Sequence, residues 1–132
     1  MPREIKTHHV DELNQAISIK VGTACGRGGA PLAYRVEVEN VEGDSYEIVN
    51  SVYLKFHEGP VDEGFNGITS EALLAVLIDR LMCLKAGPYP DEFYTTAIKY
   101  LILAHGNLVK SHCEASGTEE ARQLDSKEHV NG

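Results

Sequence analysis

The segment from Phe56 to Gly67 has residue types that suit the binding of a small molecule. It reads F-H-E-G-P-V-D-E-G-F-N-G and follows a run of apolar residues typical of a strand. Phe56 offers an aromatic face to a nucleotide base, and the Asn66 amide can hydrogen-bond the edge of that base. A helix predicted just beyond the segment would present backbone N–H groups to a phosphate. The residues alone leave a second interpretation equally open, namely a strand-to-helix connection with Phe56 in the core.

A second glycine-rich stretch, Gly26-Arg27-Gly28-Gly29, has a composition that could bind an anion. Glycines let backbone N–H groups approach an anion closely, and Arg27 adds a fork of donors. The stretch is not a Walker motif, because the Lys-Ser/Thr step and the required spacing are missing. Taken alone, these residues fit a flexible hairpin loop better than an anion site.

The six histidines of the chain do not form a metal-binding pattern. His8 and His9 are adjacent, as are His112 and Cys113, and adjacent residues point in different directions in any regular element. The sequence contains neither H-E-x-x-H nor the paired Cys and His spacing typical of zinc sites. We therefore predict no metal ion and no cofactor.

The sequence also lacks a recognisable catalytic constellation. No G-x-S-x-G motif is present, and Cys83 lies between Met82 and Leu84, which favours a packing role for its thiol. A carboxylate pair could be drawn from Asp62, Glu63 and Asp79, but such pairs arise by chance in a chain with 20 acidic residues. We therefore predict that the chain is not an enzyme.

Length and charge narrow the class of protein. A chain of 132 residues predicts a single domain, and 42% hydrophobic with 24% charged residues is typical of a globular protein. The net charge of −8 argues against DNA binding, because affinity for phosphate backbones comes mainly from Lys and Arg. Three cysteines without C-x-x-C spacing, and no signal peptide, predict a reducing cytoplasmic compartment. The longest apolar stretch is far below the roughly 20 residues of a membrane span.

The first 57 residues predict strands, because apolar and polar residues alternate. Gly26–Gly29 and Glu42–Ser45 supply turns between them. Short strands with tight turns predict an antiparallel sheet over residues of about 10–57. The predicted strands are Ile17–Val21, Tyr34–Glu39 and Tyr46–Phe56, the last with a break at Asn50-Ser51.

From residue 69 to about 113 the apolar period becomes helical, and Gly87-Pro88 divides the stretch into two helices. The first begins at Thr69 or Ser70, and the second begins at Pro90-Asp91. The predicted packing stripes are Leu73, Leu77, Leu81 and Leu84 in the first helix and Phe93, Ala97, Leu101, Ala104 and Leu108 in the second. Residues 114–132 read as a polar tail.

The fold class is therefore α+β, an N-terminal antiparallel sheet packed with a C-terminal antiparallel helical hairpin. Both helices are apolar over a wide arc, which predicts a homo-oligomer.

The motif F-x-x-G-P-x-x-E-x-x-N-G-[IV]-[TS]-x-E-A-L-L-x-x-x-I-D-R-L, which spans Phe56 to Leu81, resembles the Thoeris anti-defence sponge family of bacteriophages. The similarity continues through the turn at Ala86-Gly87-Pro88 and, more weakly, back to Gly29–Tyr34. The helical hairpin is shared with sponges that block CBASS defence, and the preceding β half is of the Thoeris type.

The resemblance implies a non-catalytic protein that sequesters cyclic ADP-ribose isomers (gcADPR), made by bacterial TIR enzymes, in the host bacterial cytoplasm. It implies that Phe56 stacks on adenine and that Asn66 hydrogen-bonds the ligand. It also implies arginines against phosphate and ribose, with Arg35 and Arg80 as the best matches and Arg27 in reserve. Family members form dimers and hexamers built as trimers of dimers, and some take up CBASS cyclic oligonucleotides at separate sites.

Two alternatives come from other classes of protein. One is an enzyme that cleaves the cyclic nucleotide with Asp62, Glu63 or Asp79 as the base. The other is a phage structural or interaction module whose apolar helices serve assembly alone.

Overall fold

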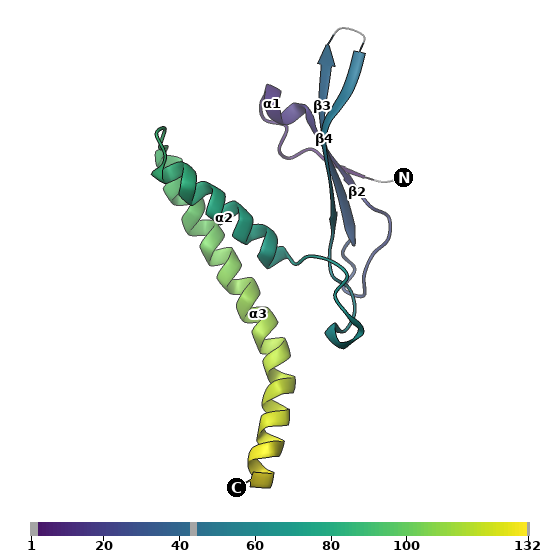
Figure 1. The fold of residues 1–132 in the computed structure, drawn as a ribbon, viewed down its shortest axis with the longest axis vertical. Coiled ribbons are helices and arrows are strands. Elements are labelled where there is room, and N and C mark those ends of the chain that lie inside the picture. Colours follow the sequence, from purple (N-terminus) through teal and green to yellow (C-terminus); the bar gives the residue numbers. More distant parts are fainter. Residues whose placement is uncertain (1–2, 43–44, 132) are drawn as a thin grey trace. The chain divides into compact units, whose positions relative to one another are not determined.

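The computed structural model describes the backbone of residues 3–42 and 45–131, and the side chains of residues 3–40 and 47–112. The chain divides into two compact units, Met1–Thr69 and Ser70–Gly132. The division coincides with the change from strand to helix periodicity predicted at residue 69. Figure 1 shows the strands and a short helix in the first unit and two long helices in the second.

The first unit is a four-stranded antiparallel sheet in which neighbours along the chain are neighbours in space, β1-β2-β3-β4. This confirms the predicted α+β fold with an N-terminal antiparallel sheet. The pattern missed the two-residue strand β1 and the four-residue helix α1, because each spans only about one period of its pattern and the period cannot repeat. The elements are β1 Glu4–Ile5, α1 Glu12–Gln15, β2 Ile17–Val21, β3 Ala33–Glu42 and β4 Ser45–Lys55.

The break predicted at Asn50-Ser51 is wrong, because β4 runs without interruption. The pairing instead shifts by one residue: Val38 faces Asn50, whereas Glu39 faces Ile48. Val49 is therefore the extra residue of a β-bulge, which lets the strand continue while its register changes. Of the turn predicted at 42–45, residues 43 and 44 lie outside the described part of the chain.

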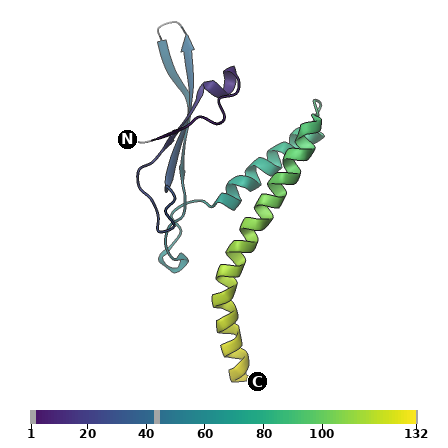
Figure 2. The same ribbon diagram turned by 180° about the vertical axis from the view of Figure 1, so that it is seen from behind.

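The second unit is a pair of contacting helices, α2 Ser70–Ala86 and α3 Glu92–Asn131. Figure 2 shows them close together at the turn that joins them and diverging away from it. The Asp91 carboxylate accepts a hydrogen bond of 2.8 Å from the Phe93 N–H and so caps α3, whose start was predicted at Pro90-Asp91. The helix extends past the predicted limit near residue 113, since the residues beyond it include no proline to end it.

The face of α3 that packs differs from the predicted stripe. The less exposed positions are Tyr94, Ala97, Ile98, Leu101 and His105, and Ile98 is buried. Phe93, Ala104 and Leu108 of α3 and Leu77 of α2 are exposed, so these four were wrongly placed in the packed stripes, whereas Ala97 and Leu101 are among the less exposed positions, as predicted. Apolar residues cover a wide arc of each helix, and the pattern therefore does not specify which part of the arc meets the neighbouring helix.

Few side chains are buried within either unit. Among the residues with described side chains, the buried apolar ones are Val21, which is 3% exposed, and Ile98, which is 8% exposed. A large share of the apolar surface therefore stays open to a further packing partner. No helix among the described residues has the length and apolar character needed to cross a membrane.

Candidate functional site

The Phe56–Gly67 segment is a loop whose two ends are joined. β4 ends at Lys55, whose carbonyl accepts a hydrogen bond of 2.8 Å from the Ile68 N–H. One residue on, the His57 N–H donates to the Ile68 carbonyl at 2.9 Å, and Phe56 pairs with Ile68 as an isolated parallel bridge. The chain thus leaves the sheet at Phe56 and returns to the same point at Ile68.

Asn66 closes the loop from within. Its Oδ1 accepts a hydrogen bond of 2.8 Å from the Glu58 N–H, and its Nδ2 donates one of 2.7 Å to the Glu58 carbonyl. One amide side chain thereby satisfies both main-chain groups of a residue that has no strand neighbour there. An amide has two donor hydrogens and two acceptor lone pairs, so half its capacity remains for a ligand.

Two rings flank this closure, the half-buried His57 and the exposed Phe65. His57 Nδ1 accepts a hydrogen bond of 3.3 Å from the Asn66 N–H, and His57 Nε2 lies 2.8 Å from the Gly59 carbonyl. Both contacts are satisfied together by the neutral ring with its proton on Nε2. The Phe65 ring lies 6.2 Å from the His57 ring, centroid to centroid, and Phe65 is 85% exposed. Sequence reasoning missed Phe65 as a candidate aromatic surface because spacing does not reveal exposure.

Phe56 combines features of the two interpretations left open above. Its N–H donates to the Leu32 carbonyl at 2.8 Å, and its ring meets the Tyr34 ring edge to face with centroids 5.7 Å apart. These are the contacts of a residue that packs on the sheet. The side chain is half-buried rather than buried, so part of the ring stays accessible.

The glycine loop around Arg27 is joined to this segment through Glu58, a residue that sequence reasoning did not single out. The Arg27 N–H donates a hydrogen bond of 3.0 Å to Glu58 Oε1. A side chain at Gly26 would collide with Glu58 Oε2, so the other carboxylate oxygen lies directly against the loop. The loop therefore binds an anion as its composition allowed, and that anion is a carboxylate of the chain itself.

Arg35 lies on the other face of the sheet from Phe56. Tyr34 and Phe56 share one face, and Arg35 alternates with Tyr34 along β3. The Arg35 side chain is exposed, and its Nε lies 3.9 Å from Glu37 Oε1. Within one chain, therefore, the structure does not bring Arg35 and Phe56 into a common pocket.

Arg80 belongs to the helical unit, on the exposed side of α2. It lines a pocket of about 540 Å³ at the end of the hairpin. The thiol of Cys83 also lines this pocket and is exposed, so the predicted packing role of Cys83 is wrong. Its position on the outer side of α2 explains the difference. The other lining residues are Val76, Asp79, Leu84, Gly87, Pro88 and Tyr89.

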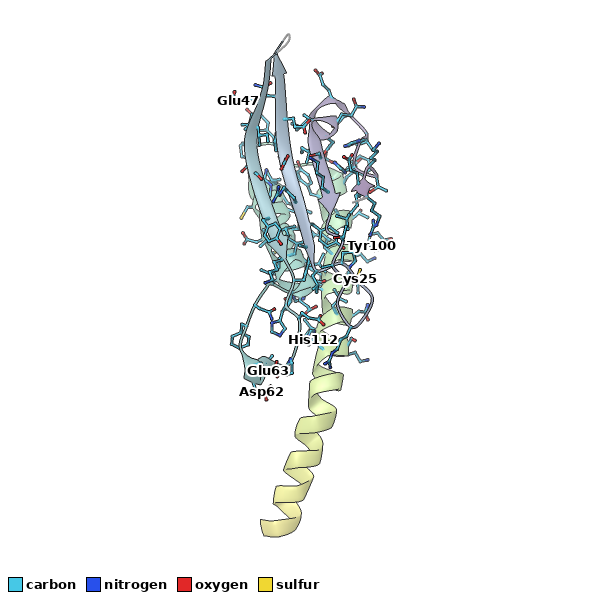
Figure 3. The ribbon with its side chains drawn as sticks, turned by 90° about the vertical axis from the view of Figure 1, so that its right-hand side faces the viewer. Cys25, Glu47, Asp62, Glu63, Tyr100 and His112 are labelled. Carbon is cyan, nitrogen blue, oxygen red and sulfur yellow. The ribbon has the colours of Figure 1, made fainter. Side chains whose placement is uncertain are left out.

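The histidines and acidic residues in the described part of the chain do not assemble into a metal site. No group of three His, Cys, Asp or Glu side chains there could hold a metal ion. His8 and His9 do converge: both Nε2 atoms contact the Ile17 carbonyl, at 2.6 and 3.0 Å. They lie in a turn, so the opposite directions expected for a regular element do not apply. Asp62 and Glu63 are exposed on the short 3-10 helix η1, Val61–Glu63 (Figure 3).

Comparison with known proteins adds no assignment. Neither a protein-family model nor a curated protein matches the chain.

The junction at Gly67 predicts a strong effect of a single methyl group. A Cβ at Gly67 would lie 2.6 Å from both the His57 nitrogen and the Lys55 carbonyl oxygen, which are main-chain atoms that cannot rotate away. We expect Gly67→Ala to destabilise the first unit by about 1–3 kcal/mol, as overpacking does, measured by chemical denaturation. Gly28→Ala is the control, because a Cβ there would meet nothing within 4 Å. Equal stability of the two variants would contradict the joined loop.

The contact of the Glu58 carboxylate with the glycine loop can be tested separately from the contacts of Asn66 with the Glu58 main chain. Glu58→Ala removes the acceptor of the Arg27 N–H and keeps the main-chain groups that Asn66 binds. We expect amide exchange at Arg27 to accelerate roughly 2- to 10-fold, corresponding to a hydrogen bond of about 0.5–1.5 kcal/mol, while exchange at Glu58 stays unchanged. Glu63→Ala, an exposed acid of the same loop, is the control. Unchanged exchange at Arg27 would show that the contact does not order the loop.

Proposed function

We propose that the chain is a phage anti-defence sponge that sequesters TIR-derived cyclic ADP-ribose signals without cleaving them. The observation that carries the proposal is the closed Phe56–Gly67 loop, because the motif that resembles the sponge family begins in this loop, which hydrogen bonds close at its ends and at Asn66. A joined loop loses little conformational freedom when a ligand arrives, which favours the tight binding that a sponge needs.

The contacts of the loop give each proposed residue a physical role. Phe56 presents the accessible part of a ring whose orientation is fixed by Tyr34. Asn66 keeps one donor and one acceptor beyond its two bonds to Glu58, which suits the edge of adenine. Phe65 adds an exposed aromatic face beside them. Arg27 stands on the loop that Glu58 ties to this segment.

The arginines are best explained by a site shared between chains. Arg35 lies on the opposite face of the sheet from Phe56, so the two can meet one ligand when they come from different protomers. Arg80 is exposed on α2 and is accessible to a neighbouring protomer in the same way. A sponge built as a dimer, or as a hexamer of three dimers, would supply such shared pockets. The basic residues late in the second helix are Lys99 and Lys110. Two cations are few for the phosphates of a cyclic oligonucleotide, so cyclic ADP-ribose is the favoured ligand.

The surface of the helical hairpin supports self-assembly. Phe93, Tyr100 and Leu103 follow one another at spacings of seven and three on α3, as residues do along the seam between packed helices. They are 71%, 63% and 53% exposed, and a second copy would cover them with the same apolar surface. Other exposed apolar residues of the hairpin are Val76, Leu77, Met82, Tyr89, Ile102, Leu108 and Val109.

The proposed site predicts that two truncations abolish binding and leave the fold intact. Phe56→Ala and Asn66→Ala should remain folded by circular dichroism, yet lose at least 10-fold in affinity for cyclic ADP-ribose isomers by isothermal titration calorimetry. Loss of aromatic stacking and of a hydrogen-bonded edge accounts for that size of effect. Val61→Ala, an exposed apolar residue of the same loop, is the control. Wild-type affinity in both variants would refute the site.

A companion measurement separates the sponge from the alternative enzyme. The protein is incubated with the ligand and heat-denatured, and the released molecule is identified by mass spectrometry. A sponge releases the intact cyclic molecule, whereas a hydrolase releases a linear product. An interaction module would release nothing and would show no ligand-dependent change in Tm.

The exposed apolar seam of α3, formed by Phe93, Tyr100 and Leu103, predicts an oligomer. Light scattering after size-exclusion chromatography should therefore give a mass above the 14.5 kDa of one chain. Tyr100→Glu places a charge in the seam and should shift the protein to a smaller species. Lys99→Glu is the control, because Lys99 is exposed and about 100° around the helix from Tyr100. A wild-type mass of one chain would refute self-assembly through these residues.

A further inference from the structure

Asn66 is followed directly by Gly67, and both residues are exposed on the Phe56–Gly67 loop. Asparagine is among the thermolabile residues of proteins, because the backbone nitrogen of the next residue can attack its side-chain amide. Glycine favours this attack, since it has no Cβ to shield that nitrogen and allows a wide range of backbone angles. The loop therefore contains two neighbouring residues that can react with each other.

The reaction needs no enzyme and no co-reactant other than water. The Gly67 nitrogen loses its proton and bonds to Cγ of Asn66, and Nδ2 leaves with that proton as ammonia. The resulting five-membered ring holds the Gly67 nitrogen between two carbonyl carbons. Water then breaks one of these two bonds. Breaking the bond to Cγ gives aspartate, whereas breaking the bond to the main-chain carbonyl carbon gives isoaspartate.

In the closed loop, hydrogen bonds restrain the amide that must react. Asn66 Oδ1 accepts a bond of 2.8 Å from the Glu58 N–H, and Nδ2 donates one of 2.7 Å to the Glu58 carbonyl. The Asn66 N–H donates to His57 Nδ1 at 3.3 Å, which restrains the backbone beside the amide. Ring formation makes the planar amide carbon tetrahedral and releases Nδ2, so both bonds to Glu58 must break. Closure of the loop therefore opposes the reaction.

The attacking nitrogen has no comparable restraint. Among the residues that the structure describes, none accepts a hydrogen bond from the Gly67 N–H. Both residues of the pair are exposed, so hydroxide can remove the proton of this N–H and water can open the ring. The bonds of the Asn66 side chain to Glu58 are therefore the main barrier that the folded loop sets against the reaction.

Both products are incompatible with the closed loop. Aspartate replaces the donor Nδ2 by an oxygen, so two acceptors would face each other at the 2.7 Å contact with the Glu58 carbonyl. Isoaspartate lengthens the main chain by one carbon directly before Gly67. Even a Cβ at Gly67 would collide there with main-chain atoms of Phe56 and His57. A loop modified in either way therefore cannot return to its closed form.

We propose that Asn66-Gly67 is a site of spontaneous deamidation whose rate is set by closure of the loop. Opening of the loop frees the amide, the pair reacts, and the product prevents closure. Deamidation would also end binding of the cyclic ADP-ribose signal, and this consequence alone rests on the proposed function. The modification site itself rests on the Asn-Gly step and on the hydrogen bonds of the loop.

The test follows deamidation of residue 66 in the full-length protein by peptide mapping with mass spectrometry, without ligand and at mildly alkaline pH. The protein is incubated folded in buffer and unfolded in urea. Deamidation should be roughly fivefold or more faster in urea, because the two hydrogen bonds to Glu58 are lost. Equal rates in the two states, or no deamidation in urea, would overturn the proposal.

A pair of variants tests the loop in the folded protein. Glu58→Pro removes the N–H that Asn66 Oδ1 accepts from, whereas the matched control Glu58→Ala keeps it and removes the same carboxylate. Deamidation should accelerate at least about twofold in Glu58→Pro and stay near the wild-type rate in Glu58→Ala. Equal rates in the two variants would show that this contact does not protect the amide.

The proposed function fails or holds separately from this site. A protein that ignores cyclic ADP-ribose isomers, yet deamidates faster when unfolded and in Glu58→Pro, would support the modification site and refute the sponge. Wild-type affinity for these isomers after complete deamidation of residue 66 would overturn the claimed loss of binding and the ligand contact of Asn66.

Discussion

The two hydrogen bonds between the Asn66 amide and the main chain of Glu58 are the interaction on which the candidate site depends. They hold Glu58 in place, and the carboxylate of Glu58 then holds the glycine loop at Arg27. The same closure sets the positions of His57 and Phe65 beside it. One amide thus connects an aromatic surface, a cationic loop and the end of the sheet, which would otherwise be separate exposed features.

A second constraint is the small amount of apolar surface that each unit buries. Val21 and Ile98 are the buried apolar residues in the described part of the chain, whereas the outer stripe of α3 from Phe93 to Leu103 is open. Burial of apolar area is the main favourable term in folding, so an assembly that covers this stripe would also stabilise each protomer. In the proposed shared site, binding and assembly would be linked, because Arg35, which lies on the face of the sheet opposite Phe56, would reach the ligand from a neighbouring protomer.

The α+β class, the antiparallel sheet and the start of α3 at Asp91 were predictable because they follow from short-range patterns. Alternation, turn residues and a capping carboxylate act within a few residues. The bulge at Val49 and the packed face of α3 were not predictable in this way. Both depend on which neighbouring strand or helix each residue meets, and an arc of apolar residues fits more than one neighbour.

The sequence by itself determined which residues could take part in chemistry, namely the Phe56–Gly67 segment, the glycine loop and the arginines. Only the tertiary structure decided how they are grouped, because strand alternation and register set the face on which each side chain lies. It joined Arg27 to the loop through Glu58 and separated Arg35 from Phe56. It also set Arg35 between Lys20 and Tyr53, partners that lie 15 and 18 residues away along the chain and meet only because three strands pair.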